Sequence, residues 1–522
     1  MEPHKGAFIR LNGDRKRAIE NITTNWLKDR HMEMAGATEW LSSAFPVQKK
    51  TPGEWRGVID YRGVNLLVET DVFPLPRIGD ILERQGRRHI WSIIDLKDAF
   101  SQVPLTEESR NILAIQTPLG VVRPRMMPQG YKNSPSVWQR MIEWCMKDIR
   151  DIADPYIDDV LIGTERKDGM TEEELIDAHM NDIRKVLNCL AEHKLVADLK
   201  KTTLFCKVVE FCGHKLSEGQ RQPSPGKMMA LEKWPLPTTI STLRGFLGFC
   251  NYYSEYVPDY ASYAAPLQEM LKVDKVSGRK GSKTPVHYGP LEKKAFQDLR
   301  SVLLKNLLLQ NVDPDKPYVL CVDASGSTIG GSVNQLIDTN RMPTKEDVLS
   351  KKVKPVAFFS KKLTPGQRDK WCIHEKEMYA IIMMLRKYAG WVGSQPVLVV
   401  TDHSSLTKWM TEVLATPTGP TGRQARWHQL MAHFDVYVEY ITGTQNLVAD
   451  AMTRLAYPAG GGFKDDSKHG GHEETVQVHK DEVQYRMEER ACRILIIQDD
   501  EGTQMLIRAS VGKTGMEVWP QV

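Results

Sequence analysis

The sequence lacks long apolar runs and paired cysteines. No stretch approaches the roughly 18 apolar residues needed to cross a bilayer, and the first 20 residues lack the apolar core of a signal peptide. The eight cysteines are scattered, with no Cys-x-x-Cys pair and no spacing suited to a zinc knuckle. An internal repeat is also missing. These absences argue against a membrane protein and a zinc module, and they predict a reduced intracellular location.

An excess of charge of one sign is missing too. The chain has 70 Lys and Arg against 66 Asp and Glu, a net charge of +4, so any affinity for nucleic acid has to come from local grooves. A composition of 41% hydrophobic and 26% charged residues is typical of a globular protein. At 522 residues the chain predicts roughly three or four domains.

Short strand-like runs alternate with helical patterns in two parts of the chain, which predicts a multidomain α+β fold. In the first part we expect strands at 42–50, 55–62, 88–96, 114–123 and 156–163, and helices at 134–149 and 172–193. A helical region around 240–257 follows, with Pro235 and Pro237 at its entry. In the second part we expect strands at 318–324, 356–362, 396–402 and 434–442, with helices at 291–307 and 375–388. Residues 491–498 and 503–511 read as a small hairpin.

The segment ADPYIDDVLIGT, residues 153–164, places Asp158 and Asp159 at a turn between two strand-like runs. Asp is a common turn residue, and this local explanation is sufficient for the segment alone. The alternative is that bound divalent cations offset the repulsion, since Mg²⁺ is held by carboxylates together with substrate phosphates. That hypothesis needs a third carboxylate, and Asp95 at the end of the expected strand 88–96 is a good candidate, although it is also a common strand-end cap.

Two further segments are suited to binding a nucleotide. The run FPVQKKTPGEWRGVIDYRGVN places Lys49, Lys50 and Arg56 in a hairpin, where they can grip triphosphate oxygens, Arg bidentately. The run MPQGYKNSPSVWQRMI contains a turn at Gln129 and Gly130 that leads into a helix, which suits the approach of backbone amides to a nucleotide.

Four acids in the second part follow the same logic. Asp323 and Asp402 end expected strands, a glutamate starts a helix, and Asp450 lies early in another helix. Each alone is an ordinary strand cap or surface charge. Together at one sheet edge they predict a two-metal nuclease site, in which one metal activates water and the other stabilises the leaving oxygen. Glu375 and Glu377 point to opposite sides of their helix, so only one of them belongs to the site.

These motifs resemble a known family. VIDYRGVN, IIDLKDAFSQVPL, MPQGYKNSPSVWQ and YIDD occur in the order of a reverse transcriptase, and the stretch containing GFLGFCNYYSEYV resembles the gypsy type of LTR retrotransposon. VDAS, FFSKKLTPGQRDKW, TDHSSL and GTQNLVADAMTR resemble the ribonuclease H fused to such polymerases. The resemblance covers about residues 40–272 and 310–455. It implies a right-hand polymerase of fingers, palm and thumb, followed by a ribonuclease H-like domain with a mixed sheet.

The resemblance also implies site residues and cofactors. The catalytic metal ligands would be Asp95, Asp158, Asp159, Asp323, Glu377, Asp402 and Asp450, with Asp158 a stronger candidate than Asp159 and Glu375 solvated. Each site would hold two Mg²⁺ ions, with Mn²⁺ as an alternative. The incoming nucleotide would contact Lys49, or Lys50 in its place, together with Arg56, Gln129 and Gly130; Phe100 would exclude a ribose 2′-hydroxyl or simply pack in the core, and Lys201 would lie near the leaving pyrophosphate or at an exposed helix end.

One feature departs from the family pattern. Many ribonucleases H carry a histidine in the loop before the last acid, whereas this chain has YITGTQN there. His403, directly after Asp402, is a conceivable substitute, although it also suits a surface position. We therefore expect slower product release.

The expected domains are an N-terminal segment (1–40), fingers and palm (41–215), a thumb-like region (216–272), a connection (273–309), a ribonuclease H domain (310–456) and a linker with an unassigned tail (457–522). The resemblance predicts an RNA-directed DNA polymerase with ribonuclease H activity that acts on an RNA template, a DNA primer, deoxynucleoside triphosphates and the RNA–DNA hybrid. We expect it in a cytoplasmic particle or the nucleus, without a membrane partner; the sequence leaves its oligomeric state open.

The alternative is a host-retained nucleic-acid-binding remnant with only the ribonuclease H half active. Protease, nucleocapsid and integrase motifs are missing, which suggests a processed product, a polyprotein fragment or a gene remnant.

Overall fold

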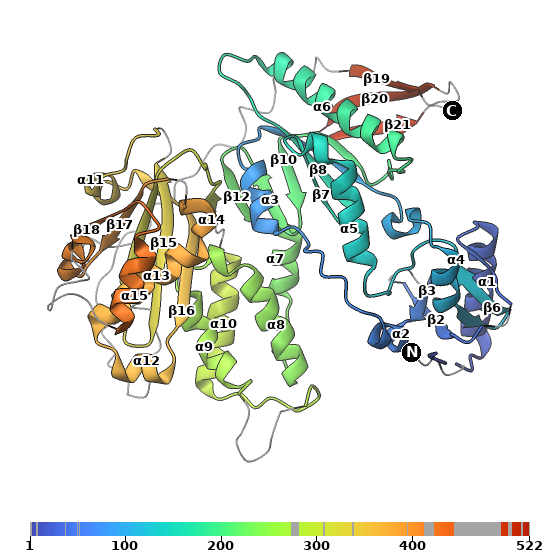
Figure 1. The fold of residues 1–522 in the computed structure, drawn as a ribbon, viewed down its shortest axis with the longest axis horizontal. Helices are drawn as coiled ribbons and strands as arrows, with labels where there is room; N and C mark the ends of the chain where they lie inside the picture. The colour runs from blue at the N-terminus through green and yellow to red at the C-terminus, as the bar shows by residue number, and fades with distance from the viewer. Residues whose placement is uncertain are drawn as a thin grey trace. The chain divides into compact units, whose positions relative to one another are not determined.

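The computed structural model describes most of the chain up to residue 442 and three strands beyond it. The described residues are 3–411, except 7–8, 37, 50, 52, 273–280, 306–307, 337–338 and 394, then 422–442 and strands within 492–520. A helix with the length and hydrophobicity of a membrane span is absent from this part of the chain. The chain divides into two units (Figure 1): the first comprises 1–81, 88–207 and 479–522, the second 82–87 and 208–478.

The first unit begins with a five-stranded sheet of order β1-β6-β5-β2-β3. Its strands are β1 (Met32–Met34), β2 (Ser42–Gln48), β3 (Trp55–Asp60), β5 (Ile115–Thr117) and β6 (Gly120–Pro124). Helix α1 (Gly13–Lys28) packs on β1, β2 and β3, with Ile19 fully buried in the shared core. The short helices nearby are α2 (Arg62–Leu67), α4 (Glu107–Ile112) and η1 (Ala99–Gln102), while α3 (Ile78–Gln85) runs across the division between the units.

The second sheet of this unit has the order β19-β20-β21-β9-β4-β8-β7. Its strands are β4 (Ile90–Asp95), β7 (Ala153–Tyr156), β8 (Asp159–Thr164), β9 (Thr203–Cys206), β19 (Cys492–Gln498), β20 (Gln504–Gly512) and β21 (Gly515–Pro520). Helices α5 (Ser134–Cys145) and α6 (Glu172–Glu192) cover it, with η2 (Lys147–Ile149) after α5. The predicted pairing of the last strands is confirmed, because β19 and β20 are antiparallel neighbours; β21 was not expected.

A buried hydrogen-bond chain fastens α6 to this sheet. The Phe205 N–H donates to Ser92 Oγ (3.0 Å), which lies 2.8 Å from His179 Nε2. On the other side of the ring, Thr164 Oγ1 lies 2.7 Å from Nδ1 and donates to Asp182 (2.8 Å). Because Thr164 donates to Asp182, its oxygen accepts from Nδ1–H. Burial lowers the pKa of His179 to about 4, so the ring is neutral near pH 7 and its Nε2 accepts from Ser92.

The second unit begins with a four-stranded sheet, β10-β11-β12-β13, next to a helical bundle. The strands are β10 (Val208–Phe211), β11 (His214–Ser217), β12 (Gln220–Pro223) and β13 (Leu309–Gln310); the helices are α7 (Pro225–Glu232), α8 (Ile240–Tyr252), η3 (Ser254–Tyr256), α9 (Tyr260–Glu269) and α10 (Pro290–Leu304). The first three strands run across residue 215, where we predicted a domain boundary, so the division of this region into domains stays a prediction.

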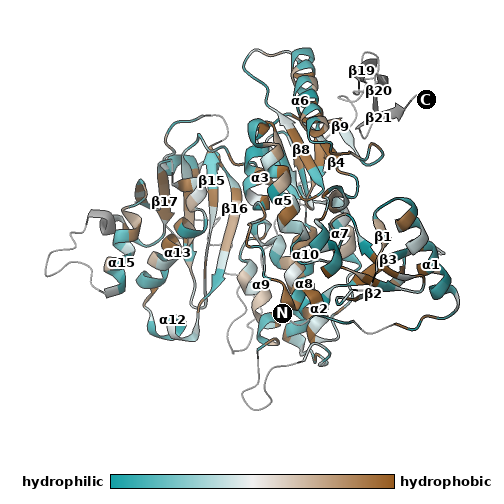
Figure 2. Cartoon of the chain, turned by 45° about the vertical axis from the view of Figure 1, so that its right-hand side comes forward, coloured by the Kyte–Doolittle hydropathy of each residue, from teal (hydrophilic) through white to brown (hydrophobic). Residues whose placement is uncertain are grey.

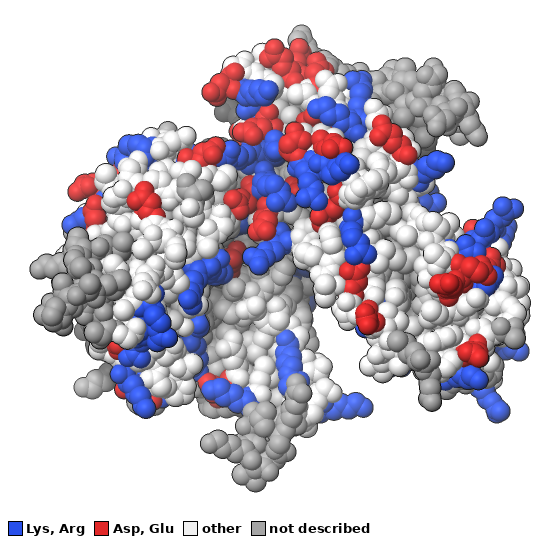
Figure 3. Space-filling model, viewed as in Figure 1, with Lys and Arg blue, Asp and Glu red and all other residues white. Residues whose placement is uncertain are grey.

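The rest of the second unit is built around a mixed sheet of order β16-β15-β14-β17-β18. Its strands are β14 (Tyr318–Ala324), β15 (Thr328–Leu336), β16 (Val353–Lys362), β17 (Val397–Thr401) and β18 (Val436–Tyr440). The helices are α11 (Lys345–Leu349), α12 (Pro365–Lys370), α13 (Ile373–Lys387), α14 (Ala389–Val392), η4 (Ser404–Thr411) and α15 (Gly422–Met431). Helix α13 packs on β14 and β15 (Figure 1). Hydrophobic residues concentrate in the strands that these helices cover, whereas charges of both signs mix on the surface (Figures 2 and 3).

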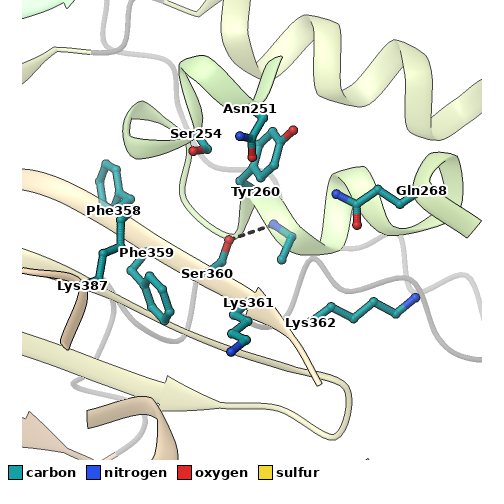
Figure 4. Close-up of a pocket in the computed structure, with 11 residues that line it drawn as sticks. Asn251, Ser254, Tyr260, Gln268, Phe358, Phe359, Ser360, Lys361, Lys362 and Lys387 are labelled. Atoms are coloured by element: carbon teal, nitrogen blue, oxygen red, sulfur yellow. Dashed lines mark hydrogen bonds between the residues drawn. The ribbon is translucent and has the colours of Figure 1, made fainter. Parts of the chain in front are cut away.

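The outer edge of β16 is covered by α9 rather than exposed. The Ala261 N–H donates to Ser360 Oγ (2.8 Å) beside a pocket of about 350 Å³ (Figure 4). The pocket is lined by three lysines that point away from one another: Lys361 donates to the Tyr379 hydroxyl, while Lys362 and Lys387 pair with glutamates. This arrangement protects an edge strand that would otherwise offer unpaired backbone groups.

Strand β15 was not predicted, because its glycines and polar residues read as a turn of small residues. The packing explains the glycine at 331: a Cβ there would lie 2.3 Å from the Cys321 carbonyl oxygen and 2.6 Å from Met384 Sδ. Glycine therefore allows α13 to approach the centre of the sheet closely.

We predict that Gly331→Ala destabilises the second unit by roughly 1–3 kcal/mol, because the added methyl overpacks the contact between strand and helix. The matched control is Gly326→Ala, where a Cβ meets nothing within 4 Å. Urea unfolding of both variants measures the difference, and equal stability of the two would contradict this account of β15.

We also predict a pH dependence from His179. Between pH 6.5 and 4 the unfolded chain binds a proton that the native ring does not, so stability falls as the pH falls through this window, by about 3 kcal/mol in total. His179→Gln keeps a donor and an acceptor without titrating. Its unfolding free energy, measured in urea from pH 7 to pH 4.5, should depend less on pH than that of the wild type; identical pH profiles would refute a neutral buried ring.

Candidate active sites

Strand register brings the first set of predicted acids together. In the antiparallel pair of β4 and β8, Asp95 is directly opposite Asp159, and the Leu96 N–H donates to the Asp158 carbonyl (2.7 Å). Tyr156 of β7 also pairs with Asp159, so the hairpin turn consists of Ile157 and Asp158, and Asp159 is the first residue of β8. The sequence had suggested both aspartates as the turn.

The turn residue Ile157 is strained and held by α5. Its φ of +54° is unfavourable for a β-branched residue, which persists there only when its surroundings fix it. The Ile157 N–H donates to Gln139 Oε1 (2.8 Å), Gln139 Nε2 donates to the Pro155 carbonyl (2.9 Å), and Trp138 Nε1 donates to the Ile157 carbonyl. Sequence reasoning missed this role of Trp138 and Gln139, although both belong to the SPSVWQ motif, which is the signal that could have revealed them.

The electrostatics of this site reflect crowded carboxylates. Burial, then the charges of Asp158 and Asp95, raise the pKa of Asp159 to about 6, and Lys201 counteracts this rise. Lys201 Nζ lies 3.1 Å from Asp95 Oδ1, and the carboxylate raises the pKa of this lysine. Lys201 lies well beyond the end of α6, so the alternative of a helix-end lysine is not what the structure shows.

A cavity of about 630 Å³ lies beside the sheet β1-β6-β5-β2-β3 of the first unit. It is lined by three of the residues predicted to contact a nucleotide, Arg56, Gln129 and Gly130, and also by Trp26 of α1. Gly130 has a φ of +92°, and its carbonyl accepts a hydrogen bond from Asn65 Nδ2 (2.9 Å), which fixes the turn. The structure thus brings these predicted residues to one cavity.

The other predicted nucleotide contacts lie elsewhere. Lys49 lies directly after β2, in the loop of the β2–β3 hairpin, and pairs with Glu54 (3.2 Å). Both side chains are about half exposed. Phe100 packs against the hydrophobic core under β4 and β8, in agreement with the packing alternative, and does not line the cavity. Lys50 lies outside the described residues.

A second set of acids meets at one edge of the mixed sheet. Strands β14 and β17 are parallel neighbours, so their carboxyl ends carry Asp323 and Asp402 to the same edge. Glu377 reaches them from the N-terminal part of α13. Ligand atoms of these three residues all lie within 4.8 Å of one another, and they form the only such group of three or more acidic, histidine or cysteine residues in the described part of the chain. Asp450 lies outside the described residues.

Glu377 is the most buried member of this group. Its Oε1 accepts the Ala324 N–H (2.9 Å), whereas Oε2 is buried with no hydrogen-bond partner. Burial, then the charges of Asp323 and Asp402, raise the pKa of Glu377 to about 8, although the Ala324 N–H and the Thr401 hydroxyl favour its ionised form. Convergent carboxylates with a buried orphan oxygen fit a hard divalent cation, which neutralises the repulsion.

The neighbours of these acids differ partly from expectation. Glu375 is not simply solvated: its side chain is 13% exposed and accepts hydrogen bonds from Arg423 (2.6 and 3.0 Å). A helical period alone cannot reveal this partner in α15. His403 Nδ1 lies 2.7 Å from Ser405 Oγ, which is also 2.8 Å from His374 Nδ1.

Comparison with known proteins places both units. Residues 47–216 match the family model "Reverse transcriptase (RNA-dependent DNA polymerase)", and residues 313–434 match "RNase H-like domain found in reverse transcriptase". Solved foamy viral protease–reverse transcriptases share the fold: one in complex with double-stranded DNA has a TM-score of 0.69 at 22% identity, covering 84% of this chain and 71% of that one. Another, with an RNA/DNA hybrid, has a TM-score of 0.64 at 20% identity, covering 100% and 64%. The predicted α+β fold of a polymerase followed by a ribonuclease H-like domain is confirmed.

Curated relatives add the type of element. The chain is 29% identical over 408 residues to the retrovirus-related Pol polyprotein from transposon 297 of Drosophila melanogaster, covering 77% of this chain and 34% of that protein. It is also 29% identical to the corresponding polyprotein from transposon gypsy of the same organism, covering 76% and 36%. The chain thus spans about a third of the length of these relatives. It contains a segment that matches the reverse transcriptase model followed by one that matches the RNase H-like model, and it is similar to the Pol polyproteins from transposons 297 and gypsy.

Proposed function

We propose that this chain is an RNA-directed DNA polymerase that also cleaves the RNA strand of RNA–DNA hybrids. Its substrates are an RNA template, a DNA primer and deoxynucleoside triphosphates. The observation that carries the proposal is the gathering of carboxylates at a sheet edge in both matched domains, Asp95 with Asp158 and Asp159, and Asp323 with Glu377 and Asp402. The foamy viral relatives bind double-stranded DNA and an RNA/DNA hybrid, which supports nucleic-acid partners here.

In the polymerase site the three aspartates are proposed to hold divalent cations, Mg²⁺ or Mn²⁺. Bound there, two such cations supply charge neutralisation for the phosphates and lower the pKa of the primer 3′-hydroxyl. Arg56, exposed on β3, is suited to grip the triphosphate, and the turn at Gln129 and Gly130 lies across the same cavity. Lys201 beside Asp95 can neutralise the leaving pyrophosphate, as Lys49 can neutralise the triphosphate.

Phe100 retains its predicted role as a barrier to a ribose 2′-hydroxyl. The residue follows Ala99 in the short helix η1, five residues after the end of β4, and packs partly against the core. A ring fixed in this way is compatible with both packing and exclusion of a hydroxyl group.

In the nuclease site, Asp323, Glu377 and Asp402, joined by Asp450, are proposed to hold two divalent cations. The unpartnered Glu377 Oε2 and the close approach of the three carboxylates support this assignment. His403 lies directly after Asp402 and is proposed to take the place of the histidine missing from the following loop. We expect product release to be slow.

A second function is favoured by one specific difference between the sites. The acids of the nuclease site meet within ligand distance, whereas the described part of the polymerase site contains no group of three acids that do. The alternative function is a host-retained nucleic-acid-binding remnant in which only the ribonuclease H half is active.

The predicted division into six segments, the location in a cytoplasmic particle or the nucleus, and the origin by polyprotein processing also stay predictions.

One preparation of the chain tests both functions. We predict that Asp158→Asn reduces primer extension on an RNA template by about 10³-fold or more while hybrid cleavage stays near wild type, because each site has its own acids. Asp323→Asn should show the reverse. Each variant is the matched control of the other. Equal extension by wild type and Asp158→Asn would refute the polymerase, and cleavage without extension by the wild type would favour the remnant.

Metal binding by the nuclease site gives a separate prediction. Glu377→Gln should abolish cleavage and raise the melting temperature in metal-free buffer by a few degrees, because the neutral amide removes a buried repulsion and keeps an oxygen for the Ala324 N–H. Mg²⁺ should stabilise the wild type more than the variant. Differential scanning calorimetry with and without Mg²⁺ measures this, and an equal Mg²⁺ effect on both proteins would contradict the ligand assignment.

A further inference from the structure

The N-terminal part of α13 contacts several separate segments around the proposed nuclease site. Its residues His374, Glu375, Lys376 and Glu377 each hydrogen-bond a different part of the fold. His374 contacts Ser405 after β17, Glu375 binds Arg423 of α15, and Glu377 accepts the Ala324 N–H. The partners of His374, Glu375 and Glu377 are groups that such polar side chains commonly bind. The buried lysine requires its own explanation.

Lys376 is only 7% exposed, and its charge is held by backbone carbonyls. Its Nζ donates to the Arg368 carbonyl at the end of α12 (2.9 Å) and to the Gly326 carbonyl (3.2 Å). Asp369 is close enough for Lys376 to lower its pKa, but that carboxylate is exposed and paired first with Arg368 (2.7 Å). Burying an ammonium group costs free energy unless its donors are satisfied. An apolar residue would fill this position at a lower cost if packing were its only role.

The Gly326 carbonyl belongs to the turn that follows Asp323. Residues 325–327 connect β14 to β15, and Asp323 lies at the end of β14, three residues before Gly326. Glu377 accepts the Ala324 N–H on one side of this turn, and Lys376 donates to the Gly326 carbonyl on the other. Two adjacent side chains of α13 thus hold the turn by its backbone.

We propose that Lys376 is a positioning residue of the nuclease site, which fixes the turn after Asp323 so that Asp323 and Glu377 face the same cation. The proposal rests on the proposed ribonuclease H function. Lys376 acts through the backbone and not on the substrate. Groups that orient metal ligands typically change metal affinity or activity by roughly 10- to 100-fold when they are removed.

The experiment uses the full chain with Lys376→Met, which keeps the apolar stem and removes the donors, and Lys376→Arg, which keeps a charged donor. Lys370→Met, at an exposed lysine at the end of α12, is the matched control. For each protein, cleavage of a labelled RNA–DNA hybrid is measured across a Mg²⁺ titration, together with primer extension and the melting temperature.

We expect Lys376→Met to need roughly 10-fold more Mg²⁺ for half-maximal cleavage, with unchanged primer extension. Lys376→Arg should recover part of the loss, and Lys370→Met should match the wild type. A wild-type Mg²⁺ midpoint in Lys376→Met would overturn the proposal, as would a lowered melting temperature with cleavage lost at every Mg²⁺ concentration in both Lys376 variants. A wild type that does not cleave the hybrid would instead refute the proposed nuclease function.

Discussion

Repulsion between carboxylates at the ends of neighbouring strands is the constraint that both units must satisfy. In the first unit the antiparallel register places Asp95 opposite Asp159, and in the second the parallel strands carry Asp323 and Asp402 to one edge, where Glu377 joins them. Partial burial strengthens this repulsion. Burial first, and then the charges of the neighbouring carboxylates, raise the pKa of Asp159 to about 6 and that of Glu377 to about 8. The surrounding structure must therefore hold the acids together when no cation does.

The two units use the same kind of support, which acts on the backbone and not on the carboxylates. In the first unit Trp138 and Gln139 of α5 bind the backbone of the strained residue Ile157. In the second unit α13 binds the turn after β14 through Lys376. Support of this kind acts on the backbone that carries the acids and so preorganises them as a set of ligands.

The predictable part of the fold follows from local patterns. Runs of β-branched residues marked the strands, and acids at strand ends marked both sites, because a sheet presents side chains at its edge in a regular way. The unpredicted part depends on residues distant in sequence. Strand β15 packs closely against α13 because Gly331 leaves room for Met384. Glu375 pairs with Arg423 of α15, which is 48 residues away in the sequence. Neither partner can be read from a helical or strand period.

The sequence-based prediction and the structure differ most in the relative importance that they give to Asp158 and Asp159. The sequence favoured Asp158 as the ligand and treated Asp159 as the more dispensable acid. In the structure Asp158 is the exposed turn residue, whereas Asp159 is half-buried and faces Asp95. A cation offsets more repulsion at the buried carboxylate, because its charge is screened less by water. Asp159 therefore has more to gain from a bound cation, while Asp158 lies exposed at the tip of a turn that α5 holds in a strained conformation.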